Sequence, residues 1–432
     1  MEIGKVNPQL RLLSQIDIRG KIVLVRVDHN VVKKGKINDP YRIEATMGTL
    51  YAIAEKGGRP ILMTHIGRPK DKKTGKIKCD DGESVIPIVR YLEQKLPIKI
   101  EVPSFPTDPD GGILTPDTIL RGEIEDLKRG RIGMIYLPNT RWFQGEQSKG
   151  PEREKFTKWL SQLADVYVND AFGSWQPDAS TFDIARELTS CAGHLLQKEI
   201  ENLDAVLEPQ RPFLAVVAGA KYDTKLGPLK ALYEKADHLI LGGLMYNTFL
   251  AAQQGVDVAG VTEEDKSLAS ELVELNERGK KILTMPYLVE SELPAEKTVG
   301  KFKTVKVDDF RKGVKLNYLL DVDPASLGRQ EIKDAVLSSK TIFVNAVMGL
   351  MPSFFEGSQA LYRLIASNRS AMKLFGGGDT LQELKSLCPG IYMSGLDDPK
   401  TYYFTGGGSV LTAIENGSPY GLKPVEALLA RK

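Results

Sequence analysis

Short β-branched segments alternate with longer amphipathic segments along the whole chain, and no other feature restricts the fold as strongly. Such alternation is typical of a mainly parallel sheet whose faces are covered by helices. The pattern runs through the first 200 residues and then starts again. We therefore expect an α/β protein with two doubly wound, Rossmann-like parallel sheets. The predicted strands are Ile22–Asp28, Ile61–His65, Ile98–Val102, Gly133–Leu137 and Val166–Asn169 in the first half, and Phe213–Gly219, His238–Gly242, Ile282–Pro286, Ile342–Asn345 and Met372–Phe375 in the second.

One amphipathic segment lies between the two runs and marks the domain boundary. Leu195–Val206 lies between the two halves and has the periodicity of a helix, so we expect it to connect the domains. The predicted domains are residues 1–194 and 207–432, and the C-terminal tail is a candidate to pack back on the first domain. Further predicted helices are Arg42–Lys56, Leu226–Lys235 and Glu263–Arg278, and residues 105–130 are predicted to form a surface loop followed by a helix.

Composition excludes several classes of function. The formal net charge is only +2, so there is no strong overall field to attract nucleic acid or a membrane surface. No run of 18 or more apolar residues occurs, so no membrane-spanning helix is expected. The three cysteines, Cys79, Cys191 and Cys388, are far apart, which argues against a disulfide framework or a zinc site. We expect a cytoplasmic protein.

Polar side chains in the first half follow the predicted strands. Ligands of open parallel sheets bind beyond the carboxyl ends of the strands, so these residues are candidates for a site. Guanidinium groups bind carboxylate and phosphate in a bidentate manner. One arginine alone would more often lie on a solvated surface, but three at matching strand ends indicate a small, multiply charged anion. The candidate residues are Arg42, His65, Arg68 and Arg141, with Asp28 and Asn30 placed to hold a hydroxyl group.

A glycine-rich segment in the second half, Gly376-Gly377-Gly378-Asp379-Thr380, follows a predicted strand and opens a predicted helix. Glycines allow backbone N–H groups to approach a phosphate, and a helix N-terminus adds partial positive charge. Asp379 is an apt ligand for a Mg²⁺ ion that is carried by nucleotide phosphates. The alternative is an ordinary glycine turn in which Asp379 caps the helix.

A second segment with phosphate-binding character, Gly219-Ala220-Lys221-Tyr222-Asp223-Thr224-Lys225, also lies between a strand and a helix. It has neither the Walker A spacing nor the dinucleotide fingerprint, which excludes a P-loop enzyme and a dehydrogenase. Lys221 and Lys225 could neutralise the charge of a transferring phosphoryl group, or they could be a solvated pair at a helix start. Gly242-Gly243, Asn345 and Gly406-Gly407-Gly408 are weaker candidates at other strand ends.

Taken in order, these segments resemble the phosphoglycerate kinase family along nearly the whole chain. The order and spacing of eight elements are more specific than any one of them. Val25–Val31 resembles the family's RVDFNVP, Asp39–Ile43 its substrate-arginine segment, His65–Pro69 its HxGRP, Asn139–Phe143 its ENLRF, Asn169–Gly173 its NDAFG, Gly219–Lys225 its GAKVxxK, Gly376–Thr380 its GGGDT and Thr405–Gly408 its STGGG.

The resemblance implies an activity and a role for each candidate. The activity is reversible phosphoryl transfer between ATP or ADP and 3-phosphoglycerate or 1,3-bisphosphoglycerate, with Mg²⁺. The enzyme would be a monomer whose two sites face each other across a cleft, with Leu195–Val206 as the hinge helix about which the cleft closes. Arg42, Lys225 and the backbone N–H groups of Gly378 and Gly407 would stabilise the phosphoryl group in transfer, and Asp379 would serve the metal. Asp28, Asn30, Arg42, His65, Arg68 and Arg141 would hold 3-phosphoglycerate; Gly219, Ala220, Lys221, Lys225, Gly242, Gly243, Asn345, Gly376, Gly377, Gly378, Asp379 and Thr380 would bind the nucleotide.

Several positions depart from the family pattern, and two segments bear directly on the substrate sites. Ser174–Ser180 stands where the family has TAHRAHAS; it is one residue shorter, lacks the two histidines and a substrate arginine, and contains Asp178. Val344–Pro352 stands where the family has WNGPxGVFE, and Pro352 takes the place of the glutamate that binds the nucleotide ribose. Glu356 could substitute for that glutamate if the loop is rearranged.

These departures leave three functions open. The first is a phosphoglycerate kinase with an altered acid-substrate pocket. The second is a kinase of the same fold that acts on another phosphorylated carboxylate. The third is a non-catalytic nucleotide-binding relative, against which the retained Arg42, Lys221, Lys225 and Asp379 count, because a protein without activity has no need of both halves of a phosphoryl-transfer site.

Overall fold

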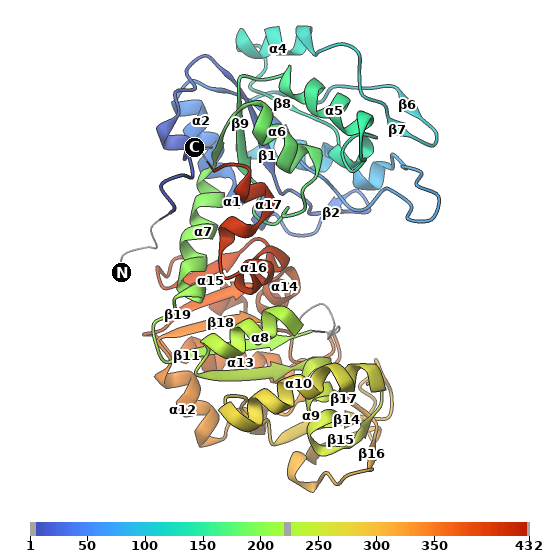
Figure 1. Ribbon diagram of the computed structural model, residues 1–432, viewed down its shortest axis with the longest axis vertical. Coiled ribbons are helices and arrows are strands. Elements are labelled where there is room, and N and C mark those ends of the chain that lie inside the picture. The colour runs from blue at the N-terminus through green and yellow to red at the C-terminus, as the bar shows by residue number, and fades with distance from the viewer. Residues whose placement is uncertain (1–5, 220–225, 430–432) are drawn as a thin grey trace. The chain divides into compact units, whose positions relative to one another are not determined.

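The computed structural model describes residues 6–219 and 226–429. The chain divides into two compact units (Figure 1). Unit 1 contains residues 1–201 and 420–432, and unit 2 contains residues 202–419. The division therefore falls inside helix α7, His194–Leu207, which includes the predicted connecting segment. The C-terminal segment belongs to unit 1, where Leu10 forms a β-bridge with Leu429 and the Asn7 backbone N–H donates to the Tyr420 hydroxyl.

Unit 1 is built on a six-stranded sheet with the order β10-β9-β1-β4-β8-β5, and all of its pairings are parallel. Its strands are β1 Ile22–Val27, β4 Arg59–Met63, β5 Ile100–Glu101, β8 Met134–Tyr136, β9 Val166–Asp170 and β10 Thr189–Ala192. Its helices, apart from α7, are α1 Tyr41–Ala45, α2 Met47–Glu55, α3 Ile86–Lys95, α4 Arg121–Lys128, α5 Pro151–Ser161, α6 Ile184–Glu187 and α17 Lys423–Glu426. Two short hairpins complete it, β2 Val32–Lys33 with β3 Lys36–Ile37 and β6 Thr107–Asp108 with β7 Gly112–Ile113.

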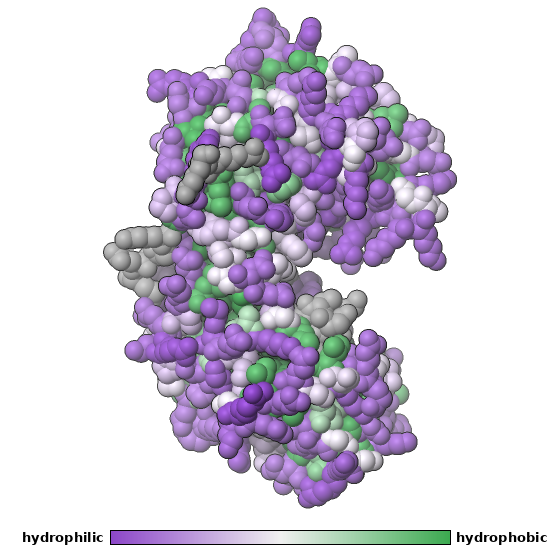
Figure 2. Space-filling model, viewed as in Figure 1, coloured by the Kyte–Doolittle hydropathy of each residue, from purple (hydrophilic) through white to green (hydrophobic). Residues whose placement is uncertain are grey.

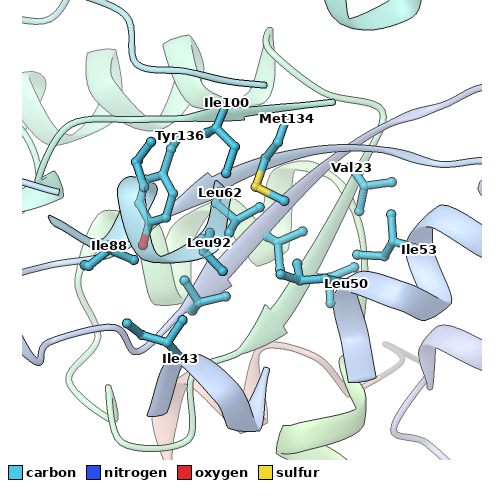
Figure 3. Close-up of a cluster of buried hydrophobic side chains, with 14 of the residues drawn as sticks. Val23, Ile43, Leu50, Ile53, Leu62, Ile88, Leu92, Ile100, Met134 and Tyr136 are labelled. Carbon is cyan, nitrogen blue, oxygen red and sulfur yellow. The ribbon is translucent and has the colours of Figure 1, made fainter. Parts of the chain in front are cut away.

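The core on one face of this sheet is formed by apolar side chains of α1, α2 and α3 (Figure 3). Successive residues of a strand point to opposite faces, so Val23, Val25 and Val27 contribute to this core while Leu24 and Arg26 point to the other face. Arg26 is fully buried there, which makes it the one charged residue inside an otherwise apolar β1. The side chains labelled in Figure 3 are Val23, Ile43, Leu50, Ile53, Leu62, Ile88, Leu92, Ile100, Met134 and Tyr136.

Unit 2 is built on a five-stranded parallel sheet with the order β12-β11-β18-β19-β20. Its strands are β11 Phe213–Ala218, β12 His238–Gly242, β18 Thr341–Asn345, β19 Met372–Gly376 and β20 Thr401–Phe404. Its helices are α8 Leu226–Lys235, α9 Gly243–Gln254, α10 Glu263–Gly279, α11 Pro324–Leu327, α12 Gln330–Ser338, α13 Glu356–Ser367, α14 Gly378–Leu387, α15 Pro389–Leu396 and α16 Gly407–Glu415. Two smaller sheets accompany it, β13 Asp257–Val258 with β16 Lys315–Leu316, and β15 Phe302–Lys306, β14 Tyr287–Ser291 and β17 Tyr318–Val322.

The two parallel sheets confirm the predicted fold class, but two elements differ from the prediction. The predicted strand Ile282–Pro286 is wrong: only Ile282 bridges to the main sheet, and the strand that follows is β14, which pairs antiparallel with β15 and β17. Pro286 has no N–H to donate, so the strand begins after it. The predicted helix Arg42–Lys56 is divided at Thr46, whose hydroxyl donates to the Ile43 carbonyl oxygen at 2.8 Å and competes with the helical bonding.

Hydrophilic side chains cover most of the face drawn in Figure 2, and hydrophobic ones form only small areas on it. Within the described residues, no helix is both long and apolar enough to cross a membrane.

Candidate active site

The carboxyl ends of β1 and β4, which are neighbours in the sheet of unit 1, bring Asp28 and His65 into one region. Asp28 follows β1 and is only 3% exposed. The Arg42 guanidinium on α1 donates to Oδ2 of Asp28 at 3.1 Å. The other carboxylate oxygen, Oδ1, is buried and has no hydrogen-bond partner among the described residues. An unpaired buried acceptor is costly, so this oxygen is suited to a hydroxyl group supplied by a ligand.

A tight loop after β4 is held between Asn30 and Arg141. Gly67 has φ +61°, a conformation that favours glycine, and a Cβ atom on it would lie 1.9 Å from the Glu83 carboxylate. Its N–H donates to Oδ1 of Asn30 at 3.0 Å, and its carbonyl oxygen accepts from the Arg141 guanidinium at 2.5 Å. Nε of Arg141 is buried and has no hydrogen-bond partner in the described part of the chain. The loop thereby positions Arg141 with donors left over for an anion.

His65 is buried at this carboxyl edge of the unit 1 sheet, which we call the rim, and the charges of four arginines act on it. Burial and then the positive charges of Arg26, Arg141, Arg42 and Arg68 hold the pKa of His65 well below its usual value, so the ring is neutral at pH 7. The Arg26 guanidinium donates to Nδ1 of His65 at 3.0 Å. The Arg68 side chain is exposed and has no hydrogen-bond or ion-pair partner among residues 6–219 and 226–429. The rim therefore concentrates positive charge around a neutral histidine, as an anion site requires.

Arg26 was not a candidate from the sequence, because its strand is otherwise apolar. Its Nε donates to Oγ of Ser180 at 2.9 Å, and Ser180 donates in turn to the Glu146 carboxylate at 2.6 Å. Another of its guanidinium N–H groups donates to the Val27 carbonyl oxygen. Glu146 and Ser180 are fully buried, so this chain of bonds balances a buried positive charge with a buried negative one.

We expect Arg26→Ala to destabilise unit 1 by about 3–5 kcal/mol, because it leaves the buried Glu146 without its counter-charge. Urea unfolding at pH 7, followed by tryptophan fluorescence, measures this loss. Arg59→Ala is the control, since Arg59 is exposed at the amino end of β4, whereas Arg26 is buried near the carboxyl end of the neighbouring strand β1. Equal midpoints for the two variants would contradict the prediction. The fluorescence reports on unit 1 because all three tryptophans, Trp142, Trp159 and Trp175, belong to it.

His29, which stands where the family motif has phenylalanine, serves the core of unit 1. It is fully buried, and its ring nitrogens lie 2.9 Å from the Tyr136 hydroxyl and 3.0 Å from Oγ1 of Thr46. Burial, with the charge of Arg26, lowers the pKa of His29 to about 3. Both nitrogens are occupied, so His29 is not a ligand-binding residue of the rim.

In unit 2, the loops after β18, β19 and β20 meet at the carboxyl edge of the sheet. Nδ2 of Asn345 donates to the Gly376 carbonyl oxygen at 2.6 Å. Gly377 has φ +113°, and a Cβ atom on Gly407 would lie 2.5 Å from Cα of Gly377. Because only glycine allows this approach, the N-termini of α14 and α16 lie side by side, with Gly378 and Gly407 as their first residues. Two adjacent helix N-termini form a site with exposed N–H groups and partial positive charge.

The loop after β18 also covers the start of α9. The Gly243 N–H donates to the Met348 carbonyl oxygen at 3.2 Å, and a Cβ atom on Gly242 would lie 2.5 Å from the Met348 sulfur. Gly243 has φ +58° and opens α9. Thr380, in the first turn of α14, is 3% exposed. Gly219 follows β11 in the same sheet, whereas Ala220, Lys221 and Lys225 lie outside the described residues.

Glu356, the possible substitute for the missing glutamate, is held in an ion pair at the start of α13. It is the first residue of α13, where its carboxylate pairs with the Lys297 ammonium and also accepts from the Phe355 N–H. Partial burial acts to raise the pKa of Glu356, but the Lys297 ammonium and the backbone contacts together outweigh it and lower the pKa. The carboxylate is therefore engaged in an ion pair, and the hypothesis that it replaces the ribose-binding glutamate has no support in this arrangement.

Asp379 fits a magnesium ion that is held mainly by phosphates. It lies in the first turn of α14, beside the glycine loop, and its exposed side chain has no hydrogen-bond or ion-pair partner in the described part of the protein. Among the described residues there is no group of three or more acidic, histidine or cysteine side chains that could hold a metal ion. One free carboxylate suits Mg²⁺, which keeps several waters and is commonly bound by one or two carboxylates with substrate phosphates.

Comparisons with known proteins agree with this architecture. The family model of phosphoglycerate kinase matches residues 13–417. The phosphoglycerate kinase of Dictyoglomus turgidum is 34% identical over 413 residues, which cover 93% of this chain and 95% of that protein. The phosphoglycerate kinase of Desulfotalea psychrophila is 35% identical over 432 residues, which cover 97% of this chain and 100% of that protein.

A solved structure gives the same result at the level of the fold. The phosphoglycerate kinase of Coxiella burnetii superposes with a TM-score of 0.73 and 26% sequence identity, and the match covers 97% of this chain and 98% of that one. The family model and the relatives each span nearly the whole chain, including both sheets and their rims. The chain belongs to the phosphoglycerate kinase family.

Proposed function

We propose that the rim of unit 1 holds 3-phosphoglycerate and that the glycine loops of unit 2 hold ATP or ADP. The reaction follows from the family: the chain is a phosphotransferase that moves a phosphoryl group reversibly between the nucleotide and a carboxyl group. The observation that supports the acid-substrate site most directly is the convergence of Arg26, Arg42, Arg68 and Arg141 on the neutral His65.

Each group of the acid substrate has a complementary partner on this rim. The phosphate and carboxylate call for guanidinium donors, which Arg42, Arg68 and Arg141 supply. The hydroxyl group calls for an acceptor, which is the unpaired Oδ1 of Asp28. Because His65 is neutral, it can form a hydrogen bond with the substrate without adding a further positive charge that would slow product release.

For the nucleotide we assign the phosphates to the N–H groups at Gly378 and Gly407, where α14 and α16 begin. Gly219, Ala220, Lys221, Gly242, Gly243, Asn345, Gly376, Gly377 and Thr380 complete the assigned nucleotide site. Asp379 would hold Mg²⁺, which supplies positive charge that neutralises the phosphates. Arg42 and Lys225, with the N–H groups of Gly378 and Gly407, stabilise the charge of the phosphoryl group as it is transferred.

Binding of 3-phosphoglycerate to the full chain in the absence of nucleotide tests the acid-substrate site. The fluorescence of the three tryptophans, which all belong to unit 1, provides the signal. Saturable binding that Arg141→Ala weakens supports the assignment. Binding that is unaffected by Arg141→Ala and by Arg68→Ala would place the acid substrate elsewhere.

We expect Gly407→Ala to weaken MgATP binding by about tenfold or more, because its methyl group would meet the Gly377 backbone and separate the two helix N-termini. Calorimetric titration with MgATP measures the change. Gly390→Ala is the matched control, since a Cβ atom at that helical glycine meets nothing within 4 Å. Unchanged affinity in Gly407→Ala would exclude these N-termini from phosphate binding.

A further inference from the structure

The 345–355 segment, which ends β18 and leads to α13, contacts two of the glycine segments that are assigned to the nucleotide. Nδ2 of Asn345 donates to the Gly376 carbonyl oxygen at 2.6 Å. The Met348 carbonyl oxygen accepts from the Gly243 N–H at 3.2 Å. The segment therefore joins the glycines that open α14 to those that open α9, and a shift of its backbone would reach both.

One face of α13 holds this segment at two points. The Tyr362 hydroxyl donates to the Ala346 carbonyl oxygen at 3.2 Å. Oγ of Ser358 accepts from the Met348 N–H at 2.9 Å. Ser358 and Tyr362 are four residues apart, so they lie on the same face of the helix. The two hydroxyl groups fix the backbone on either side of Val347, next to the groups that bond the glycine segments.

The same Tyr362 hydroxyl connects the 345–355 segment to α14. It also donates to Oε2 of Glu383, on α14, at 2.7 Å. Burial and the charge of Glu383 raise the pKa of Tyr362 well above its usual value, so the hydroxyl keeps its proton and is the donor. The centroid of the Tyr362 ring lies 6.4 Å from that of the Phe375 ring, and Phe375 directly precedes Gly376. One side chain of α13 thus contacts the segment, α14 and β19.

Both hydroxyl-bearing side chains are enclosed by the protein. Ser358 is 0% exposed and Tyr362 is 1% exposed. A bound nucleotide cannot touch side chains that are buried in this way, so any effect they have on binding passes through the backbone that they hold. A buried hydroxyl group is costly unless it is hydrogen-bonded, and an apolar side chain of the same shape would pack there without that cost. The backbone positions that the two hydroxyl groups fix account for their presence.

We propose that Tyr362 and Ser358 are positioning residues for nucleotide binding, because they hold the 345–355 segment in the place from which it contacts both glycine segments. This inference rests on the proposed binding of the nucleotide at those glycine segments. Loss of either hydroxyl group releases a backbone group of the 345–355 segment, lets the glycine segments move apart and weakens binding.

Calorimetric titration of the full-length protein with MgATP tests the proposal in Tyr362→Phe, which keeps the ring and removes only the hydroxyl group. We expect Kd for MgATP to rise about tenfold. Binding of 3-phosphoglycerate, followed by the fluorescence of the tryptophans in unit 1, should stay unchanged. Ser358→Ala should also raise Kd for MgATP. Glu383→Gln keeps an acceptor for the Tyr362 hydroxyl and should bind MgATP nearly as tightly as wild type does.

Tyr233→Phe is the matched control. Tyr233 is also buried in unit 2, and its hydroxyl donates to a backbone oxygen, that of Leu275, at 3.0 Å. Its MgATP affinity should equal that of wild type. Far-ultraviolet circular dichroism during urea unfolding measures the stability of each variant, so that every titration is made on folded protein.

Wild-type MgATP affinity in folded Tyr362→Phe, or an equal loss of affinity in Tyr233→Phe, overturns the proposal and leaves the bonds of Tyr362 with a role in stability alone. If Tyr362→Phe does not fold, its combination with Glu383→Leu removes the buried carboxylate together with the donor and carries the same comparison. Unchanged affinity in Gly407→Ala would instead refute the assigned nucleotide site, and this inference with it.

Discussion

Arg42→Ala is expected to lower kcat/KM for 3-phosphoglycerate by about 10²–10³-fold while leaving binary MgATP binding unchanged. Arg42 lies on the rim of unit 1, with a side chain that is 25% exposed and bound to Asp28. The variant removes the Arg42 guanidinium, which would bind the acid substrate and stabilise the transferred phosphoryl group. It also leaves Asp28 buried without its counter-ion. Initial rates with varied 3-phosphoglycerate, together with a calorimetric titration of MgATP, separate the two effects.

Arg59→Ala again serves as the control for the loss of an arginine. Arg59 is exposed at the amino end of β4, away from the rim, so its kcat/KM should equal that of wild type. Lost MgATP affinity with normal 3-phosphoglycerate affinity in Arg42→Ala would reverse the assignment of the two substrates to the two units.

Lys225→Ala is expected to lower kcat by about 10²–10³-fold with the protein still folded. Lys225 lies outside the described residues, so this expectation rests on the resemblance of Gly219–Lys225 to the family motif and on the need of phosphoryl transfer for positive charge. Single-turnover rates measure the chemical step without interference from product release. Lys230→Ala, which removes a lysine of α8 from a surface ion pair with Glu271 of α10, should leave the rate unchanged. Near-normal turnover in Lys225→Ala would exclude Lys225 from a role in stabilising the phosphoryl group during transfer.

The parallel sheets could be predicted because their strands are short, β-branched and separated by helical periodicity. β11, for example, is buried along its whole length, and the prediction Phe213–Gly219 differs from it by one residue. The antiparallel strands β15 and β17 could not be predicted in the same way. No residue of β15 is buried, and β17 contains the charged Asp321 among its buried residues, so neither strand has the continuous apolar pattern of a buried parallel strand.

The rim could be predicted in part, because strand ends are visible in a sequence but pairings between distant residues are not. Asp28, Arg42 and Arg141 were candidates through their positions after strands or in motifs. Arg26 was missed because its partner Ser180 lies 154 residues away in the sequence, and no local pattern links them. A charged residue within a fully buried strand was the available signal, since such a group requires a partner.

The departures from the family motif show where sequence comparison reaches its limit. The resemblance identified Pro352 as a substitution but could not say whether Glu356 would compensate for it. The answer depends on Lys297, a residue 59 positions away that pairs with Glu356.

The most direct test of the central claim is a coupled assay for ATP consumption by the full-length protein with 3-phosphoglycerate and Mg²⁺, run beside a control without the acid. We predict turnover that depends on 3-phosphoglycerate and is lost when Mg²⁺ is chelated. Absence of acid-dependent turnover, in a folded protein that still binds ATP, would contradict the account and would assign the site to another phosphorylated carboxylate or to binding alone.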